Sequence, residues 1–250
     1  MRPKTDKEIE LMREGGRLLA QILQKLAVET KPGVKPVEIS ALAAEEVKAA
    51  KLTPVLLGYE GFNDVMCISV NEAIVHGMPS TKPFKEGDVV KLDLTVANHG
   101  MVVDSAITVV AGGSKPPADV QRLIEGTKKA LDAGIAAIKG DGTRVGDIAA
   151  AIQKVLDQYH LGIIRDLVGH GVGHAIHEDP NVPNYGVTGT GPILHTGSTI
   201  AIEPMASLGD WRIKVAKDGW TISMADDSLG AHFEHTVLIT DDGAEILTLS

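Results

Sequence analysis

The feature that most limits what this chain can fold into is a pair of alternating segments joined by a tight turn. Apolar side chains occupy every second position from 90 to 96, and Met101, Val103 and Ile107 resume the pattern after Asn98-His99-Gly100. A period of two is typical of a β-strand with one apolar face, and two such runs around a glycine turn predict a hairpin. An apolar sheet face needs a covering layer, so other elements must pack on it.

Helical patterns flank this hairpin on both sides. Thr5 and Glu8 have the spacing of a capping box, and apolar residues then recur at helical intervals up to Pro32-Gly33. We expect further helices that begin after Pro36, after Pro116-Pro117 and at a Thr143 cap.

The rest of the chain favours strands. From Gly162 onward, short β-rich stretches alternate with Gly-rich turns, and the clearest strands span 198–202, 232–240 and 244–249. The order of helices, strands, helices and strands predicts an α+β fold in which the strands form one sheet and the helices cover a single face. At 250 residues the chain can bury a full core, and we expect one domain over residues 1–250.

Composition narrows the class of function. The net charge of −9 argues against a nucleic-acid or anionic-membrane surface, which would need a basic face. A single cysteine, Cys67, excludes an intrachain disulfide and a cysteine-built zinc finger, and it fits a reducing compartment. The N-terminus has no apolar signal core, and no apolar run reaches membrane-spanning length. We therefore expect a cytoplasmic monomer without nucleic-acid or membrane partners.

Two aspartates of the hairpin are the first candidates for chemistry. If the turn closes over Asn98-His99, or if a bulge lies at Gly100, Asp93 stands directly opposite Asp104. Two carboxylates that close are costly unless a cation or a shared proton lies between them. Either aspartate alone is best explained as a solvated strand residue, but the pair favours a metal site.

A glycine-rich segment, residues 169–180, contains three histidines. The glycines around His170 and His177 let the backbone turn sharply, which is typical of a ligand loop. The helical zinc-protease motif is excluded, because two glycines would break the helix that it needs. For His174 we favour an ordinary structural histidine.

Two further carboxylates complete a set of hard ligands. Glu203 ends an apolar β-rich stretch and is followed by Pro204, and Glu234 begins an apolar strand. Each is a weak signal by itself, since glutamate in a strand usually faces solvent. Four carboxylates with one imidazole suit Mn²⁺, Fe²⁺, Co²⁺ or Zn²⁺ and do not suit a thiolate zinc site.

Several short motifs follow one another along the chain. They are Cys67-Ile68-Ser69-Val70-Asn71-Glu72, Val75-His76-Gly77, Asp93-Leu94-Thr95-Val96, Val103-Asp104-Ser105, Gly169-His170-Gly171-Val172-Gly173, His177-Glu178-Asp179-Pro180, Ile202-Glu203-Pro204, Lys217-Asp218-Gly219-Trp220 and Phe233-Glu234-His235-Thr236. With these motifs the chain resembles the type I methionine aminopeptidases of the pita-bread fold over nearly all its length. The stretch between His177 and Glu203 is too short for the inserted helical subdomain of the type II enzymes.

The resemblance implies a fold, a metal centre and an activity. The fold would consist of two related halves around a central antiparallel sheet, with the helices on its outer face. Two divalent ions, drawn from Co, Mn, Fe, Zn and Ni, would be held by Asp93, Asp104, His170, Glu203 and Glu234. In the family the residues at Asp104 and Glu234 bridge both ions, His170 and Glu203 hold one, and Asp93 holds the other. A hydroxide activated by the ions would remove the initiator methionine from nascent proteins and peptides whose second residue is small, whether on the ribosome or free.

Roles around the metal centre follow from the same resemblance. Glu203 would move a proton toward the leaving amine, His177 would donate to the developing oxyanion, and His76 would contact the substrate backbone. A histidine that merely fills the turn before Gly77 is the alternative for His76. The expected walls of the methionine pocket, each of which could equally belong to the core, are Tyr59, Phe62, Cys67 and Trp220.

Two other functions compete with this one. An Xaa-Pro aminopeptidase or dipeptidase shares the fold and the five ligands, but such relatives usually carry a large domain before the catalytic one. Only a short stretch precedes Cys67 here. A metal-free binding module of the same fold should have lost at least one ligand, and all five positions are filled.

Overall fold

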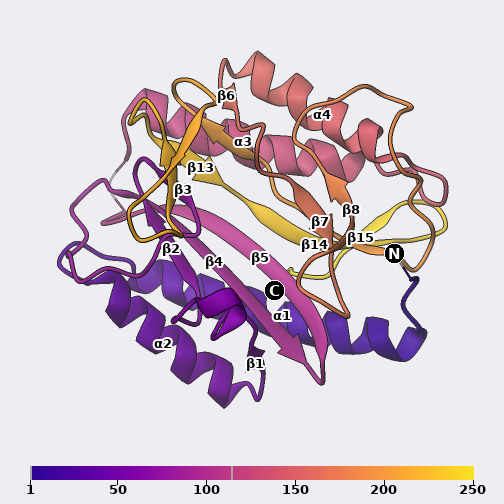
Figure 1. Ribbon diagram of the computed structural model, residues 1–250, viewed down its shortest axis with the longest axis horizontal. Coiled ribbons are helices and arrows are strands. Elements are labelled where there is room, and N and C mark those ends of the chain that lie inside the picture. The colour runs from indigo at the N-terminus through magenta and orange to yellow at the C-terminus, as the bar shows by residue number, and fades with distance from the viewer. Residues whose placement is uncertain (1, 114) are drawn as a thin grey trace.

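The computed structural model describes residues 2–113 and 115–250 (Figure 1). The helices are α1 (Asp6–Glu29), α2 (Pro36–Ala49), α3 (Ala118–Ala136) and α4 (Val145–Gln158), with a 3₁₀ turn η1 (Tyr59–Gly61). The main sheet contains β1 (Thr53–Pro54), β2 (Cys67–Val70), β4 (Val89–Asn98), β5 (Met101–Val110), β7 (Gly169–Gly171), β8 (Glu178–Val182), β9 (Thr199–Ile202), β14 (Glu234–Ile239) and β15 (Ala244–Ile246). One small sheet contains β3 (Ala73–Val75), β11 (Ile213–Val215) and β12 (Ile222–Met224), and the other contains β6 (Gly162–Ile163), β10 (Met205–Ser207) and β13 (Gly230–His232). None of the helices in these ranges is both long and apolar enough to cross a bilayer.

The helices begin where local side chains satisfy their first N–H groups. At α1 the Glu8 N–H donates to Thr5 Oγ1 at 3.4 Å and the Thr5 N–H donates to Glu8 Oε2 at 2.7 Å, so the predicted capping box is confirmed. The predicted Thr143 cap is wrong. The N-cap of α4 is the next residue, Arg144, whose N–H donates to the Asp147 carboxylate at 3.0 Å, while the Thr143 hydroxyl is already bonded within the preceding turn.

The main sheet is antiparallel and runs in the order β1-β4-β5-β14-β9-β7-β8, with β2 also on β4 and β15 also on β14. The expectation of a single sheet is wrong, since two three-stranded sheets accompany the main one. The chain leaves the main ladder after Ile202, because Pro204 has no N–H to donate, and it continues as β10 in a different sheet.

One face of the main sheet carries the helices and the apolar core. Leu92, which pairs with Ile107, belongs to a cluster with residues of α1 and α2, and Ile202, which pairs with His235, belongs to a cluster with residues of α3 and α4. Paired residues share a face, and the pair Ser105–His235 joins the two halves, so both clusters lie on the same side. The predicted α+β architecture with helices on a single face is confirmed (Figure 1).

The hairpin of β4 and β5 has a different register from the expected one. Asn98 pairs with Met101, and the two-residue turn consists of His99 and Gly100, with φ of 49° and 85°. This turn with positive φ at both central residues matches the twist of the strands. The prediction that Asp93 and Asp104 stand directly opposite each other is therefore wrong. They are diagonal neighbours on one face, since Asp93 pairs with Ala106 and Asp104 with Thr95.

One lysine is buried completely inside the sheet. Lys91 on β4 is 1% exposed, and its Nζ donates to the carbonyl oxygens of Asn71 at 2.8 Å and Val89 at 3.3 Å. Burial lowers the pKa of Lys91 to about 7, although the charges of Glu72 and Asp88 oppose this shift. The ammonium form therefore costs folding free energy at and below neutral pH.

We expect Lys91→Met to raise the free energy of unfolding by about 1–4 kcal/mol at about pH 6. Both carbonyls keep another donor, because the Gly230 N–H donates to Asn71 O and the Asn71 N–H donates to Val89 O. The folded pKa lies below the ordinary value of 10.5, so the cost of the charge is complete below about pH 7 and disappears as the pH approaches 10.5. The gain should accordingly shrink between about pH 6 and pH 9, which urea unfolding of both proteins measures. A variant less stable than the wild type at the lower pH would show that the ammonium contributes net stability.

Candidate active site

The residues predicted to bind metal lie on the face of the main sheet opposite the helices. Asp93 on β4 and Glu234 at the start of β14 both pair with Ala106 of β5, so the three residues form one row across the sheet. Asp104 precedes Ala106 by two positions and therefore lies on the same face in the adjacent row. The short side chain of Ala106 leaves the space between the carboxylates open.

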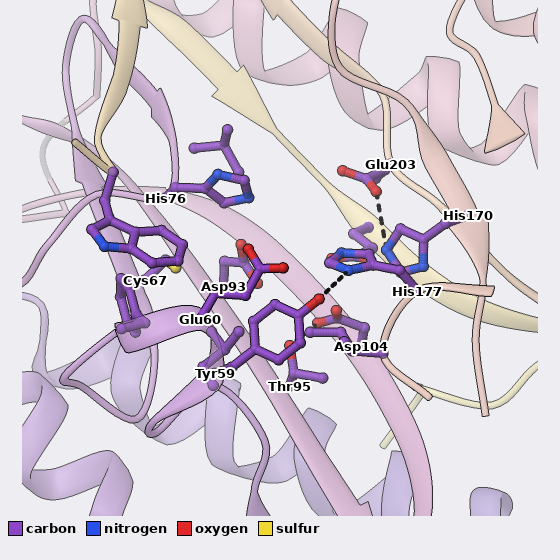
Figure 2. Close-up of a pocket in the computed structure, with 16 residues that line it drawn as sticks. Tyr59, Glu60, Cys67, His76, Asp93, Thr95, Asp104, His170, His177 and Glu203 are labelled. Atoms are coloured by element: carbon purple, nitrogen blue, oxygen red, sulfur yellow. Dashed lines mark hydrogen bonds and ion pairs between the residues drawn. The ribbon is translucent and has the colours of Figure 1, made fainter. Parts of the chain in front are cut away.

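His170 and Glu203 reach this place from the second half of the chain. His170 on β7 pairs with Ala201 of β9, and Glu203 follows the end of β9. Ligand atoms of Asp104, His170 and Glu234 lie within 4.8 Å of one another, and His170 Nε2 lies 3.4 Å from Glu203 Oε1. Strands that are distant in sequence thus bring these donors to one point (Figure 2).

All residues that the sequence analysis assigned to metal binding, catalysis or the substrate line one cavity of about 220 Å³ (Figure 2). They are Tyr59, Phe62, Cys67, His76, Asp93, Asp104, His170, His177, Glu203, Trp220 and Glu234. The structure therefore brings the candidate ligands and the candidate pocket walls together in a single space.

Burial and mutual repulsion act on the carboxyl groups of this cluster. Burial, followed by the charges of Asp104 and Glu203, raises the pKa of Asp93 well above its usual range. Burial also raises the pKa of Asp104, takes the pKa of Glu203 to about 8 although His170 opposes it, and raises that of Glu234 well above its usual range. A divalent cation would remove this repulsion, and oxygen donors with one imidazole at this spacing suit such an ion. The residues present therefore fit a divalent metal centre.

Two neutral histidines lie at the edge of the cluster. Burial lowers the pKa of both His76 and His177 to about 4, so neither imidazole carries a charge near pH 7. The His177 Nδ1 lies 3.2 Å from the Tyr59 hydroxyl, which can donate to it and leave the ring proton on Nε2. His76 has a φ of 55°, a left-handed conformation that is uncommon for residues with a side chain and more frequent at functional sites.

The other end of the cavity is apolar. Phe62 and Trp220 meet edge to face, with ring centroids 5.2 Å apart. Burial, followed by the charge of Asp93, raises the pKa of Cys67, so its thiol stays neutral and acts as a small apolar wall. An apolar side chain can enter here while the polar backbone next to it faces the carboxylates.

Sequence reasoning missed part of the cavity lining, namely Leu56, Glu60, Val75 and Thr95. Thr95 could have been found from alternation, because it follows Asp93 by two positions on the same face, where its hydroxyl donates to Asp104 Oδ1 at 2.9 Å. His232 is a second omission. Its Nε2 lies 3.6 Å from Glu203 Oε2, and within residues 2–113 and 115–250 its ring nitrogens have no hydrogen-bond partner.

Known proteins with similar sequences share this arrangement of the chain. The model of metallopeptidase family M24 matches residues 10–241. A methionine aminopeptidase from Clostridium perfringens is 40% identical over 246 residues, which cover 98% of each chain. The crystal structure of a methionine aminopeptidase from Thermotoga maritima superposes with a TM-score of 0.97, at 43% identity over 100% of each chain.

A prolidase from Pyrococcus furiosus superposes with a TM-score of 0.77, at 24% identity, over 99% of this chain and 65% of the prolidase. At that identity the likeness shows the shared pita-bread fold alone. The methionine aminopeptidases match this chain over its full length and at higher identity. The chain belongs to metallopeptidase family M24 and, within it, to the methionine aminopeptidases.

Proposed function

We propose that this chain removes the initiator methionine from nascent proteins and peptides whose second residue is small, with two divalent ions in the cavity. The observation that carries the proposal is the buried cluster of Asp104, His170 and Glu234 beside an apolar pocket. The cluster supplies the hydrolytic chemistry, and the pocket selects the side chain of the first residue.

The five candidate ligands would together hold two ions. As in the family that the motifs resemble, Asp104 and Glu234 would serve both ions, and their ligand atoms lie within 4.8 Å of each other and of one from His170. His170 and Glu203, 3.4 Å apart, would hold one ion, and Asp93 would hold the other. When bound, the ions would supply Lewis-acid activation of the attacking water and of the scissile carbonyl. We assign Mn²⁺, Fe²⁺, Co²⁺, Zn²⁺ or Ni²⁺ to these sites, because the donors are hard oxygens with one imidazole.

We assign to Glu203 the transfer of a proton from the attacking water to the leaving amine. Its carboxyl group lies between two imidazoles, 3.4 Å from His170 Nε2 and 3.6 Å from His232 Nε2. These neighbours restrict the position of the carboxyl group, so the proton donor is held beside the metal ligands.

The two neutral histidines would act on the substrate. With Nδ1 facing the Tyr59 hydroxyl, His177 keeps a proton on Nε2 that can stabilise the oxygen of the carbonyl under attack. His76 lines the same cavity and would contact the scissile amide. Methionine suits the apolar end, because its flexible thioether packs well against aromatic rings such as those of Phe62 and Trp220.

A panel of peptides, assayed with Mn²⁺ or Co²⁺ after complete chelation, tests the proposal. Met-Gly, Met-Ala and Met-Ser peptides should be hydrolysed, and Met-Leu or Met-Lys should be slower in kcat/KM by roughly 10²-fold or more, because a bulky second side chain must pass beside His76 and His177. Comparable kcat/KM for Met-Lys and Met-Ala would contradict the second-residue selection. Preferential hydrolysis of Xaa-Pro peptides over Met-Ala-Ser would instead support a prolidase-type reaction and overturn the proposed substrate.

A further inference from the structure

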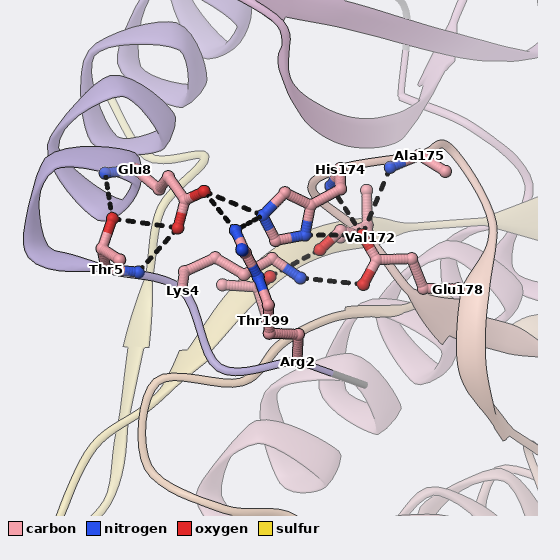
Figure 3. A network of polar contacts seen from close by, with 9 residues as sticks. All are labelled: Arg2, Lys4, Thr5, Glu8, Val172, His174, Ala175, Glu178 and Thr199. Atoms are coloured by element: carbon pink, nitrogen blue, oxygen red, sulfur yellow. Dashed lines mark hydrogen bonds and ion pairs between the residues drawn. The ribbon is translucent and has the colours of Figure 1, made fainter.

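A segment from the start of the chain lies beside the glycine-rich stretch that carries the histidines. We call residues 2–5 the N-terminal segment and residues 172–177 the histidine loop. Figure 3 shows Lys4 of the segment reaching Glu178, just after the loop. The Lys4 side chain is 0% exposed, its Nζ donates to Glu178 Oε2 at 2.9 Å, and its backbone N–H donates to Gly197 O at 2.8 Å.

Glu178 transmits this contact to the backbone of the histidine loop. Its second oxygen, Oε1, accepts hydrogen bonds from the N–H groups of His174 at 2.6 Å and Ala175 at 3.2 Å. The carboxylate thus joins a buried ammonium on one side to two loop amides on the other. Removal of the ammonium would leave a partly buried carboxylate without its cation, which weakens its hold on the loop.

The stem of Lys4 also packs directly on the loop. A Cβ atom added at Gly173 would lie 2.3 Å from Lys4 Cε, so the loop backbone approaches the lysine more closely than any residue with a side chain allows. On its other side Gly173 O accepts from the Val102 N–H at 2.7 Å. The loop therefore packs between the Lys4 side chain and strand β5.

His174 adds a second connection to the start of the chain. Its Nε2 lies 3.0 Å from Glu8 Oε1, and the same ring nitrogen lies beside the Arg2 guanidinium. Glu8 is also the residue that caps α1 through Thr5. His174 does not line the cavity, and its contacts explain the histidine that the sequence analysis expected to be structural.

The far end of the loop carries the imidazole that would face the substrate. His170 is held by strand pairing of β7, whereas His177 is the last residue of the loop, with its ring centroid 4.5 Å from that of His170. The loop conformation therefore sets the distance between the metal-binding imidazole and the one assigned to the oxyanion. A displacement of about 1 Å at such a group can cost 10²-fold in rate.

We infer that Lys4, through Glu178, is a positioning residue for His177 in the hydrolytic reaction. This inference rests on the role proposed above for His177. It assigns to the N-terminal segment a function in catalysis, although no residue of the segment lines the cavity.

Lys4→Met is the test variant, and Lys25→Met is the matched control. Lys25 likewise pairs with a glutamate, Glu46, at 2.6 Å, but it is half exposed and lies on the outer side of α1 and α2. We expect Lys4→Met to lower kcat by roughly 10–100-fold at saturating metal, with KM and metal affinity changed by less than about 3-fold. In metal-free Lys4→Met, hydrogen exchange within residues 172–177 should be faster than in the metal-free wild type. Lys25→Met should change neither kcat nor this exchange.

A double-mutant cycle with His177→Ala separates positioning from a general structural effect. In the His177→Ala background, Lys4→Met should lower kcat by less than about 3-fold, because the group that it positions is gone. Three results would each overturn the inference. They are additive losses of kcat in the double mutant, unchanged hydrogen exchange of the histidine loop in Lys4→Met, and a loss of metal affinity in Lys4→Met in place of a loss of kcat. If Lys4→Met does not fold, Glu178→Gln carries the same expectations and decides the question in the same cycle.

The two proposals fail in different ways. If His177→Ala alone leaves kcat unchanged, the proposed role of His177 is wrong and the inference falls with it. If His177→Ala lowers kcat but Lys4→Met behaves like Lys25→Met, the role of His177 stands and the inference alone is wrong.

Discussion

Asp104→Ala is expected to lower kcat/KM on Met-Ala-Ser by roughly 10³-fold or more, to the level of the chelated wild-type protein. Asp104 belongs to the group whose ligand atoms lie within 4.8 Å of one another. In the proposed arrangement it serves both ions, so its loss removes a donor from each. Titration calorimetry of the metal-free variant with Mn²⁺ measures the accompanying loss of affinity. A variant that still binds two equivalents tightly would contradict the bridging role of Asp104.

Asp93→Ala is the matched control, because it removes the same side chain from the neighbouring strand on the same face. In the proposed arrangement Asp93 touches only one ion, so the other ion should bind with nearly the wild-type affinity. Equal losses of both ions in the two variants would show that the cluster does not divide its ligands as proposed.

Thermal unfolding in chelator shows whether the Asp104 variant is folded. Burial takes the pKa of Glu203 in the folded protein to about 8, whereas its pKa in the unfolded chain is near 4. A carboxyl group whose pKa is raised on folding contributes stability that is complete below the unfolded pKa. This stability is lost as the pH rises through the folded pKa. The contribution of Glu203 to the stability of the metal-free wild type should therefore decline between about pH 4 and pH 8. Asp104→Ala removes one of the crowded carboxyl groups and should not lower Tm. A much lower Tm would attribute the lost activity to misfolding.

His177→Ala is expected to lower kcat by roughly 10²–10³-fold, equivalent to about 3–4 kcal/mol, while KM and metal content change little. A hydrogen bond to a developing oxyanion strengthens as charge accumulates, so its loss appears in kcat. Burial keeps the imidazole neutral, with a pKa of about 4, and the Tyr59 hydroxyl faces Nδ1 at 3.2 Å. Both features favour an Nε2 proton at neutral pH.

Metal analysis and steady-state kinetics of His177→Ala distinguish this role from that of a ligand. His170→Ala should lose metal affinity, because a ring nitrogen of His170 belongs to the cluster with Asp104 and Glu234. His195→Ala should change neither the metal content nor kcat, since His195 is exposed and pairs with Asp141 at 3.2 Å. Loss of one metal equivalent from His177→Ala would make His177 a ligand and refute the division of the two histidines.

The hairpin shows where sequence reasoning reaches its limit. The expected register pairs Asp93 with Asp104, and the observed register pairs Asp93 with Ala106. The two registers differ by two residues, so every side chain keeps its face in both, and the alternation of apolar residues cannot distinguish them. The turn decides between them, because His99 and Gly100 both adopt positive φ.

The sequence by itself determined the local structure and the chemical types at the site. The capping box of Thr5 and Glu8 and the alternation of β4 and β5 depend on neighbours a few residues apart. The five candidate ligands could be named because, although each is a weak signal by itself, together they form a set of oxygen donors with one imidazole, in motifs that resemble those of a known family.

Only the tertiary structure decided which distant residues meet. The order β4-β5-β14-β9-β7 brings Asp93 and His170 into one cavity, and the fold places Lys4 against Glu178 and His232 against Glu203. No spacing along the chain encodes these contacts, because each depends on how separate elements pack after their apolar faces are buried. Burial also removes water from these groups, so their charges and partners are set by the neighbours that packing supplies.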